Sequence, residues 1–183
     1  ATEMLYSVGR IAQSASIPLI ADLDTGYGNA LNVIRTVKDA VQLGLAGVLL
    51  EDQESPKKCG HFQGKRVMPM AEHAGKIRAA VQARGDSGLV IIARTDARAP
   101  LGLEEAIARG KAYIEAGADV LFVEAPQSVE ELKAIASAFP DIPLVANIVE
   151  GGKTPQLSAS QLQQMGFKIV FFPLSTLLAA TQI

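Results

Sequence analysis

Three acidic side chains stand where two apolar segments end. Asp22 and Asp24 lie in ADLDTGYGNA, and Glu51 ends GVLLE. Residues two apart in a strand point to the same side, so the two aspartates would share one face, with Glu51 on a neighbouring strand. Carboxylate oxygens are the ligands that Mg²⁺ prefers, which indicates a metal site. Asp before a glycine also commonly caps turns, so the spacing alone leaves Asp24 open to either interpretation.

The segment SPKKCGHFQGK, residues 55–65, gathers reactive side chains directly after the second of these apolar segments. It holds the only cysteine, Cys59, with Lys57, Lys58 and His61 close to it in the sequence. Positive charge near a thiol favours the thiolate, and a thiol that exchanges a proton near neutral pH can act as a general acid. The alternative is a solvated, lysine-rich surface loop in which the cysteine has no role.

Polar side chains also follow or end three further apolar segments. Arg94 follows VIIA, Glu124 follows VLFV, and Asn147 ends PLVAN. A planar guanidinium at such a position can bind a carboxylate through two parallel hydrogen bonds. Arg94 can equally form a structural ion pair with Asp96 or Glu124, and both interpretations stay open. The second histidine, His73, lies in a helical pattern and is interpreted as structural.

Apolar, β-branched segments must position these groups. They begin at residues 18, 47, 89, 120, 143 and 168. Their nearly continuous hydrophobicity is typical of parallel strands that are buried on both faces. Helical patterns that end in glycine lie between them, over residues 30–44, 70–85 and 103–117. Ser128 with Glu131, and Ser158 with Gln161, have the spacing of capping boxes that begin two more helices.

Strict alternation of strands and helices indicates either an open doubly wound sheet or a closed barrel. Polar groups at the ends of many strands favour the barrel, which takes catalytic groups from all around one rim. We therefore expect an α/β fold, the (β/α)8 TIM barrel. Such a barrel has eight strands, whereas this sequence has six apolar segments. Residues 1–183 are accordingly predicted to be a single barrel domain that lacks its N-terminal strands and C-terminal helices.

Composition excludes several classes of protein. Of the 183 residues, 49% are hydrophobic and 20% are charged, and the net charge is −2. Without an excess of positive charge, binding to nucleic acid or to an anionic membrane is not expected. A single cysteine cannot form an internal disulfide, and no apolar run is long enough to span a membrane. We expect a soluble cytoplasmic protein with a small-molecule partner.

The motifs together resemble one family. ADLDTGYGNALNVIRTV, LEDQ with PKKCGH, IIARTDA, EAGADVLFVEAP and NIVEGGKTP are similar to the isocitrate lyase and phosphoenolpyruvate mutase superfamily. The KKCGH loop resembles the carbon–carbon lyase branch of that superfamily. The resemblance implies a Mg²⁺-dependent barrel, with Mn²⁺ as an alternative metal, that cleaves a 2-hydroxy dicarboxylic acid to a 2-oxo acid and a second carboxylic acid. It also implies a homotetramer whose terminal helices swap between subunits.

The resemblance further implies roles for individual residues. Asp22, Asp24 and Glu51 would form the Mg²⁺ site, some of them through water. Cys59 would be the general acid–base residue, supported by Lys57 and His61, and would protonate the departing carbanion. The side chains expected to act in catalysis are Cys59, Lys57, His61, Arg94 and Glu124. The residues expected to contact the substrate are Cys59, Gly60, His61, Arg94, Glu124 and Asn147.

Two features bear on the substrate. Methylisocitrate lyases have an arginine three residues after the serine of PLS, where this chain has Leu178, so one carboxylate contact of a tricarboxylate substrate is absent. EGGKTP, residues 150–155, resembles the dimethylmalate lyase, oxaloacetate hydrolase and carboxyphosphonoenolpyruvate mutase relatives instead. Carboxyphosphonoenolpyruvate phosphonomutase and oxaloacetate hydrolase or decarboxylase activities are therefore alternatives to the lyase reaction. An inactive fragment or scaffold is the alternative from another class.

Overall fold

The strands of the computed structural model coincide with the six predicted segments. All run parallel in the order β1-β2-β3-β4-β5-β6, and each pairs with the next along the chain. The structure describes residues 1–60 and 64–181. The strands are β1 (Ile20–Asp22), β2 (Gly47–Glu51), β3 (Val90–Thr95), β4 (Val120–Val123), β5 (Leu144–Asn147) and β6 (Ile169–Phe171).

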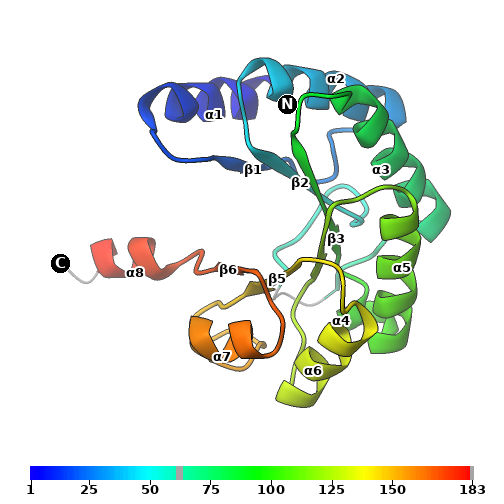
Figure 1. Cartoon of the computed structure of the whole chain (residues 1–183), viewed down its shortest axis with the longest axis vertical. Coiled ribbons are helices and arrows are strands. Elements are labelled where there is room, and N and C mark those ends of the chain that lie inside the picture. Colours follow the sequence, from blue (N-terminus) through cyan, green and yellow to red (C-terminus); the bar gives the residue numbers. More distant parts are fainter. Residues whose placement is uncertain (61–63, 182–183) are drawn as a thin grey trace.

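Helices separate the strands and cover one face of the sheet. They are α1 (Thr2–Ser14), α2 (Ala30–Gln42), α3 (Met70–Arg84), α4 (Arg98–Leu101), α5 (Leu103–Glu115), α6 (Val129–Ala138), α7 (Ala159–Gln164) and α8 (Ser175–Thr181). The sheet is curled, with α2, α3, α5 and α6 on its convex side (Figure 1). The predicted α/β fold is confirmed as six parallel βα units of a barrel, in which β1 and β6 are the edges of the sheet.

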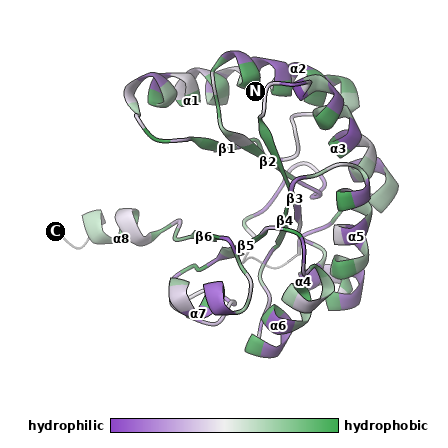
Figure 2. Cartoon of the chain, viewed as in Figure 1, coloured by the Kyte–Doolittle hydropathy of each residue, from purple (hydrophilic) through white to green (hydrophobic). Residues whose placement is uncertain are grey.

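The inner strands β2 to β5 bury side chains on both faces, as their continuous hydrophobicity predicts, whereas the edge strands β1 and β6 are partly exposed. Outward-facing residues such as Val48, Leu50 and Ile91 pack beneath the helices. The helices mix hydrophilic and hydrophobic residues, whereas β2 is mostly hydrophobic (Figure 2). The inward-facing side chains form a separate buried cluster made of Leu49, Ile92, Val120, Phe122 and Val145. Side chains alternate along a strand, so the next inward positions toward the carboxyl ends are those of Glu51, Arg94, Glu124 and Asn147.

The two predicted capping boxes have different outcomes. Ser158 and Gln161 form the complete box at the start of α7. At the start of α6, the Ser128 side chain accepts the backbone N–H of Glu131 at 3.2 Å. The Glu131 carboxylate does not return the bond to Ser128 N and accepts from Gln127 N, at 2.8 Å, and from Arg98 Nε, at 2.9 Å. The second box is therefore only half formed, because a guanidinium is a stronger partner for a carboxylate than a backbone N–H.

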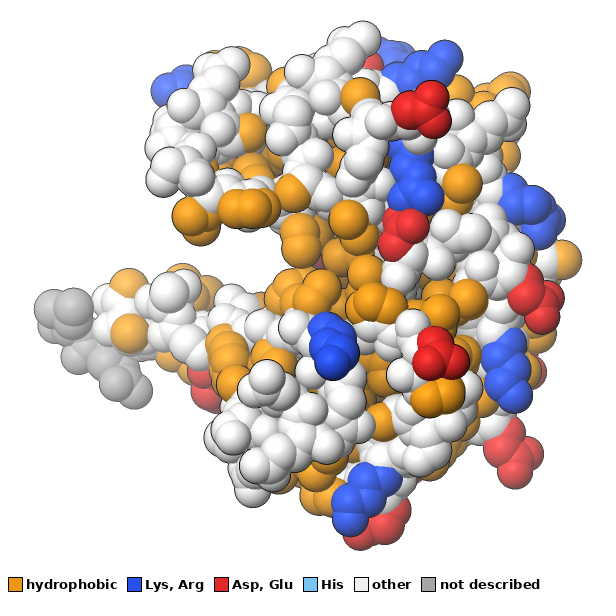
Figure 3. All heavy atoms as spheres, viewed as in Figure 1, with side chains coloured by type: hydrophobic (Ala, Val, Ile, Leu, Met, Phe, Trp, Pro, Cys, Tyr) orange, Lys and Arg blue, Asp and Glu red, His pale blue; other side chains and the backbone are white. Residues whose placement is uncertain are grey.

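The side of the sheet between β1 and β6 is hollowed. A cavity of about 390 Å³ lies there and is lined by Ile20, Asp22, Leu49, Arg94, Phe122, Asn147, Val170, Phe171, Phe172 and Pro173. The space-filling view shows a notch on this side, with hydrophobic side chains along its walls (Figure 3). Within residues 1–60 and 64–181, the helices are all too short or too polar to cross a membrane.

Candidate active site

Inward-facing side chains at the ends of neighbouring strands converge on one guanidinium. Arg94 donates to both oxygens of Asp96, with Nε–Oδ2 and Nη2–Oδ1 distances of 2.8 and 3.1 Å. Its Nε lies 3.4 Å from Oε2 of Glu51, and its Nη1 lies 3.5 Å from Oε2 of Glu124. The guanidinium carbon is 5.0 Å from the centre of the Phe122 ring. Both ion pairs considered for Arg94 are therefore present, and we call Arg94, Asp96, Glu51 and Glu124 the Arg94 cluster.

The charges of the cluster are unevenly compensated. Burial alone would lower the pKa of Arg94, but the carboxylates, above all Glu124, raise it. Burial would raise the pKa of Asp96, but Arg94 and Lys65 lower it. Glu51 differs, because burial raises its pKa to about 8 and Arg94 offsets only part of that effect. Both Glu51 carboxylate oxygens are buried without a hydrogen-bond donor among the described residues.

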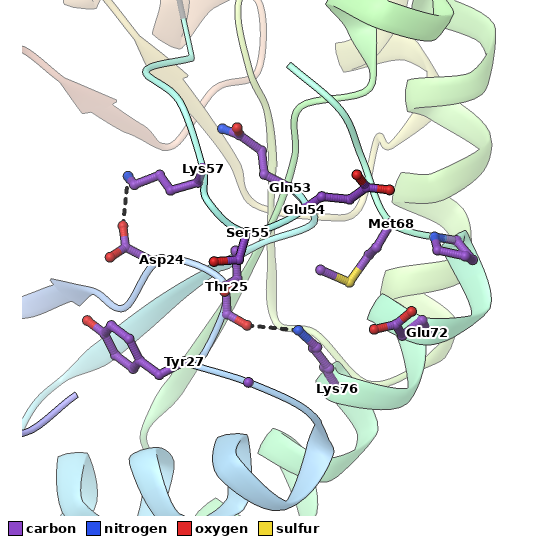
Figure 4. Close-up of a pocket in the computed structure, with 12 residues that line it drawn as sticks. Asp24, Thr25, Tyr27, Gln53, Glu54, Ser55, Lys57, Met68, Glu72 and Lys76 are labelled. Atoms are coloured by element: carbon purple, nitrogen blue, oxygen red, sulfur yellow. Dashed lines mark hydrogen bonds and ion pairs between the residues drawn. The ribbon is translucent and has the colours of Figure 1, made fainter. Parts of the chain in front are cut away.

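A lysine ammonium lies between two of the predicted metal-binding carboxylates. Lys57 Nζ is 2.7 Å from Oδ1 of Asp24 and 3.9 Å from Oε1 of Glu51 (Figure 4). Asp22 accepts the backbone N–H of Asp24 at 3.0 Å, which ties the two aspartates together. The contacts of Lys57 are thus with carboxylates, and its predicted support of Cys59 stays a prediction.

These carboxylates fit a divalent cation. Asp22, Asp24 and Glu51 offer only oxygen donors, and the two buried Glu51 oxygens, which lack a hydrogen-bond donor among the described residues, are acceptors that a cation would partner. The Lys57 ammonium shows that positive charge is attracted between Asp24 and Glu51. In the described part of the chain no three acidic, histidine or cysteine side chains are close enough to hold an ion directly. Mg²⁺ commonly binds through one or two carboxylates and keeps several waters, which suits this arrangement.

The backbone of loop 55–65 packs against the Arg94 cluster at a glycine. A Cβ atom on Gly60 would lie 2.6 Å from Nη2 of Arg94 and 2.7 Å from Cγ and Cδ of Glu124. The buried ammonium of Lys65 donates to Gly60 O at 2.5 Å and to the carboxylate that Arg94 binds, at 2.7 Å. Gly60 therefore lies at the site where a substrate contact is predicted. Lys65 is not among the predicted site residues, because nothing in the sequence distinguishes it from the other lysines of the loop.

Cys59 immediately precedes this packed glycine. Its side chain is exposed, and its thiol is free. Gln53 holds the preceding residue, because its side-chain amide donates to Lys58 O at 2.9 Å and its carbonyl accepts Lys58 N at 3.0 Å. His61 lies outside the described residues. Cys59 is thus one residue before the glycine that packs on the Arg94 cluster, and its acid–base role stays a prediction.

Asn147 adds an amide to the same rim. Its Nδ2 donates to the two oxygens of Glu124 at 3.3 and 3.4 Å. Its Oδ1 is buried without a donor among the described residues. Asn147, Arg94 and Asp22 line the cavity at the open side of the sheet. The structure therefore brings together the three side chains predicted to bind substrate outside the loop, namely Arg94, Glu124 and Asn147.

Asp52, the neighbour of Glu51, faces the helices instead. Its buried carboxylate accepts hydrogen bonds from Thr95 Oγ1, Asp96 N, Tyr113 Oη and Arg109 Nη1. Burial raises the pKa of Asp52, and these hydrogen bonds oppose that rise. His73 packs edge-on against Tyr113 at 4.6 Å between ring centres, and burial lowers its pKa to about 3. Both are parts of the core beneath the site.

Comparisons with known proteins place the chain in a family. Residues 1–183 match the model of the family described as phosphoenolpyruvate phosphomutase. The chain is 46% identical over 181 residues to 2,3-dimethylmalate lyase of Eubacterium barkeri, covering 99% of this chain and 62% of that protein. It is 52% identical over 184 residues to the chloroplastic carboxyvinyl-carboxyphosphonate phosphorylmutase of Arabidopsis thaliana, covering 98% of this chain and 54% of that protein.

Solved structures agree with these relatives. A crystal structure of 2,3-dimethylmalate lyase, a member of the PEP mutase/isocitrate lyase superfamily, matches with a TM-score of 0.96 and 41% identity, covering 99% of this chain and 61% of that one. Phosphonopyruvate hydrolase in complex with oxalate and Mg²⁺ matches with a TM-score of 0.82 and 37% identity, over 97% and 62% of the two chains. This chain spans 54% and 62% of the lengths of the two curated relatives. The chain belongs to the phosphoenolpyruvate phosphomutase family within the PEP mutase/isocitrate lyase superfamily, as its motifs predict.

Proposed function

We propose that the protein is a Mg²⁺-dependent carbon–carbon lyase that cleaves a 2-hydroxy dicarboxylic acid to a 2-oxo acid and a second carboxylic acid. The observation that carries this proposal is Glu51, a buried carboxylate without a hydrogen-bond donor in the described chain, beside Asp24 and Arg94 at the rim of the sheet. The identity to a named dimethylmalate lyase supports it. We further propose that residues 1–183 form part of one (β/α)8-barrel domain that strands outside this chain complete.

Asp22, Asp24 and Glu51 would hold the cation, in part through water. Bound there, Mg²⁺ would supply positive charge opposite the substrate hydroxyl oxygen, which becomes negative when it loses its proton ahead of carbon–carbon cleavage. Lys57 contacts Asp24 and Glu51 and balances part of their charge. An Mn²⁺ ion is an alternative occupant, because it also binds carboxylate oxygens.

Arg94 and Asn147 would orient the substrate carboxylates in the cavity that they line. Asp96 already holds the guanidinium of Arg94 through two hydrogen bonds, so little side-chain freedom is lost when a substrate binds. The backbone of Gly60, packed against Arg94 and Glu124, would close the site on the loop side. These groups favour a small acid that carries more than one carboxylate.

Cys59 would be the proton donor. The 2-hydroxyl group gives up its proton to solvent and its oxygen becomes the carbonyl oxygen of the 2-oxo acid. As the carbon–carbon bond breaks, its electron pair stays on the departing carbon, and the thiol proton moves to that carbon and leaves a thiolate. The exposed position of Cys59 lets the thiolate regain its proton from solvent before the next turnover. Lys57 and His61 would favour the thiolate in this cycle.

The experiment is a substrate panel with metal and thiol controls. Release of pyruvate, glyoxylate or oxalate is measured for 2-hydroxy dicarboxylic acids, with and without EDTA. We expect EDTA to abolish turnover, Mg²⁺ to restore it, and Cys59→Ser to lower kcat by about 10²-fold or more. Because Cys59 is the only cysteine, iodoacetamide labels one site, and C59S is the matched control that the reagent should leave unchanged. Full activity in C59S, or activity indifferent to EDTA, would sink the mechanism.

A second candidate function is transfer of a phosphorus-containing group, as in a carboxyphosphonoenolpyruvate phosphonomutase. The 52% identity to the Arabidopsis phosphorylmutase favours it. Phosphorus NMR with a phosphonate substrate separates the two reactions, because only the mutase alters the bonds at phosphorus. Oxalate release from oxaloacetate in the panel would favour the hydrolase alternative instead.

We also propose a homo-oligomer, a tetramer by family resemblance. Helix α8 has no buried residue among those described, and it exposes Leu177 and Leu178 with 59% and 39% of their surfaces accessible. Exposed apolar side chains on a helix with no buried residue in the described part of the chain suit a contact with a second copy. Sedimentation equilibrium measures the assembly, and a monomer at micromolar concentration contradicts the proposal.

A further inference from the structure

A second cavity lies beside the predicted metal-binding carboxylates. It measures about 660 Å³ and is walled by the turn after β1, the loop after β2 and the beginning of α3 (Figure 4). Asp24 and Lys57 lie on one side of it, and Lys76 of α3 lies on another. We call residues 24–28, which connect β1 to the start of α2, the Asp24 turn.

The Asp24 turn holds its backbone in conformations that side chains disfavour. Asp24 and Tyr27 have φ angles of 51° and 62°, and Gly26 and Gly28 have φ angles of 82° and 147°. A non-glycine residue in this region costs about 1–3 kcal/mol and persists only where its surroundings hold it. The position of the Asp24 carboxylate therefore depends on the contacts that hold the turn.

Hydrogen bonds from two directions hold the Asp24 turn. On the sheet side, Glu51 N donates to Asp24 O at 2.8 Å, and Gly26 N donates to Leu23 O at 2.9 Å. On the helix side, Lys76 Nζ donates to Thr25 O at 3.1 Å, as the dashed line in Figure 4 shows. Thr25 lies between Asp24 and Gly26, so the lysine holds the turn at its centre.

Lys76 is an unusual residue in this position. It is only 4% exposed, and in the described part of the chain no carboxylate lies within ion-pair distance of its ammonium. Burial lowers the pKa of Lys76, and Glu72 opposes this effect from one helical turn earlier. An apolar side chain would fill the same space without burying an ammonium. The hydrogen bond to Thr25 O is therefore the contact that accounts for a lysine here.

We propose that Lys76 is a positioning residue for the metal site. The hydrogen bond from Lys76 to Thr25 O fixes the Asp24 turn and thereby holds the Asp24 carboxylate in place relative to Glu51. The inference rests on the proposed function, because it takes Asp24 as part of the Mg²⁺ site. Groups that hold metal ligands from behind typically change metal affinity by about 10–100-fold when they are removed. Lys76 should therefore act on Mg²⁺ affinity more than on the chemical step.

The test measures Mg²⁺ binding directly, by titration calorimetry on the purified, chelator-treated protein without substrate. Lys76→Met keeps the length of the side chain and removes the donor, Lys76→Arg keeps a donor, and Lys111→Met is the control on the exposed face of α5. We expect the Kd for Mg²⁺ to rise about 10-fold or more in K76M, to return to within about threefold of the wild type in K76R, and to stay unchanged in K111M. With saturating Mg²⁺, kcat of K76M should stay within about threefold of the wild type.

The outcomes separate the inference from the proposed function. A wild-type protein that binds no Mg²⁺ overturns the proposed function and the inference with it. A wild type that binds Mg²⁺, with a folded K76M of equal Kd, overturns the inference alone. If K76M does not fold, as judged by circular dichroism, Lys76→Gln replaces it, and a Kd equal to that of the wild type in K76Q again overturns the inference.

Discussion

Replacing Gly60 by alanine adds one methyl group at a tight contact of the candidate site. The new carbon would lie 2.6 Å from Nη2 of Arg94 and 2.7 Å from Cγ of Glu124. Non-bonded heavy atoms normally stay about 3.5–4.0 Å apart, so the loop or its neighbours must move by about 1 Å. The φ angle of Gly60 is not in the left-handed region, so alanine tolerates the backbone and the effect is purely steric.

Neither side of this contact moves freely. Asp96 holds the Arg94 guanidinium through two hydrogen bonds, and Lys65 holds Gly60 O at 2.5 Å. Overpacking of a buried contact costs about 1–3 kcal/mol, and a misplacement of about 1 Å near the reacting groups can cost about 10²-fold in rate. We therefore expect Gly60→Ala to lose about 1–3 kcal/mol of unfolding free energy and about 100-fold in kcat/KM.

Urea denaturation measures the first loss, and steady-state kinetics on the preferred acid measures the second. Gly75→Ala is the matched control, because its Cβ in α3 would have no neighbour closer than Arg78 Nη2 at 4.0 Å. That variant should gain about 0.5–1 kcal/mol, since alanine is the better helix former, and should keep full activity. Wild-type kcat/KM in G60A would refute the placement of loop 55–65 at the site, even if stability fell.

Three further predictions concern buried charge. The pKa of His73 is about 3 against an ordinary value of 6.5, so only the unfolded state takes up a proton at this residue as pH falls from 6.5 to 3. The unfolding free energy should therefore drop by up to about 1.4 kcal/mol per pH unit, and His73→Phe should lack that slope in urea titrations. Lys65→Met should lose about 3–5 kcal/mol in the same assay, because Gly60 O and the buried Asp96 lose a charged donor, and a loss below 1 kcal/mol would contradict this. In chelator-treated protein, the pKa of Glu51 is about 8 against an ordinary value of 4.5, so the folded state keeps a proton that the unfolded state releases, and the unfolding free energy should fall as pH rises from 4.5 to 8. Glu51→Gln should abolish that fall, and parallel pH profiles for the variant and the wild type would contradict the raised pKa.

The sequence predicted the strands well because parallel strands buried on both faces need nearly continuous apolar runs. The predicted segments begin within two residues of the observed strands, at 18 against Ile20 and 168 against Ile169, for example. Alternation along each strand then explains why Glu51, Arg94, Glu124 and Asn147 meet, since each is the last inward position of its segment. Asp52, one residue beyond Glu51, is expected on the opposite face by the same rule, and it lies there.

Pairing choices within the site could not be predicted. Arg94 binds Asp96 through two hydrogen bonds and also lies near Glu51 and Glu124, and only the packed geometry ranks these carboxylates. Lys57 is two residues from Cys59 in the sequence, which suggested that it supports the thiol. The folded loop carries its ammonium to Asp24, 2.7 Å away. Loop conformation, which spacing along the chain does not specify, decides this contact.

Three lysines lie against oxygens of the rim. Lys57 contacts Asp24, Lys65 contacts Gly60 O, and Lys76 contacts Thr25 O. All come from the segment between β2 and the middle of α3, and each contacts a different part of the rim. Lys57 and Lys65 also form ion pairs with Asp24 and Asp96, and such pairing lowers the cost of burying a carboxylate. The β2–α3 segment therefore does more than carry Cys59, since its lysines supply positive charge and hydrogen bonds to the rim.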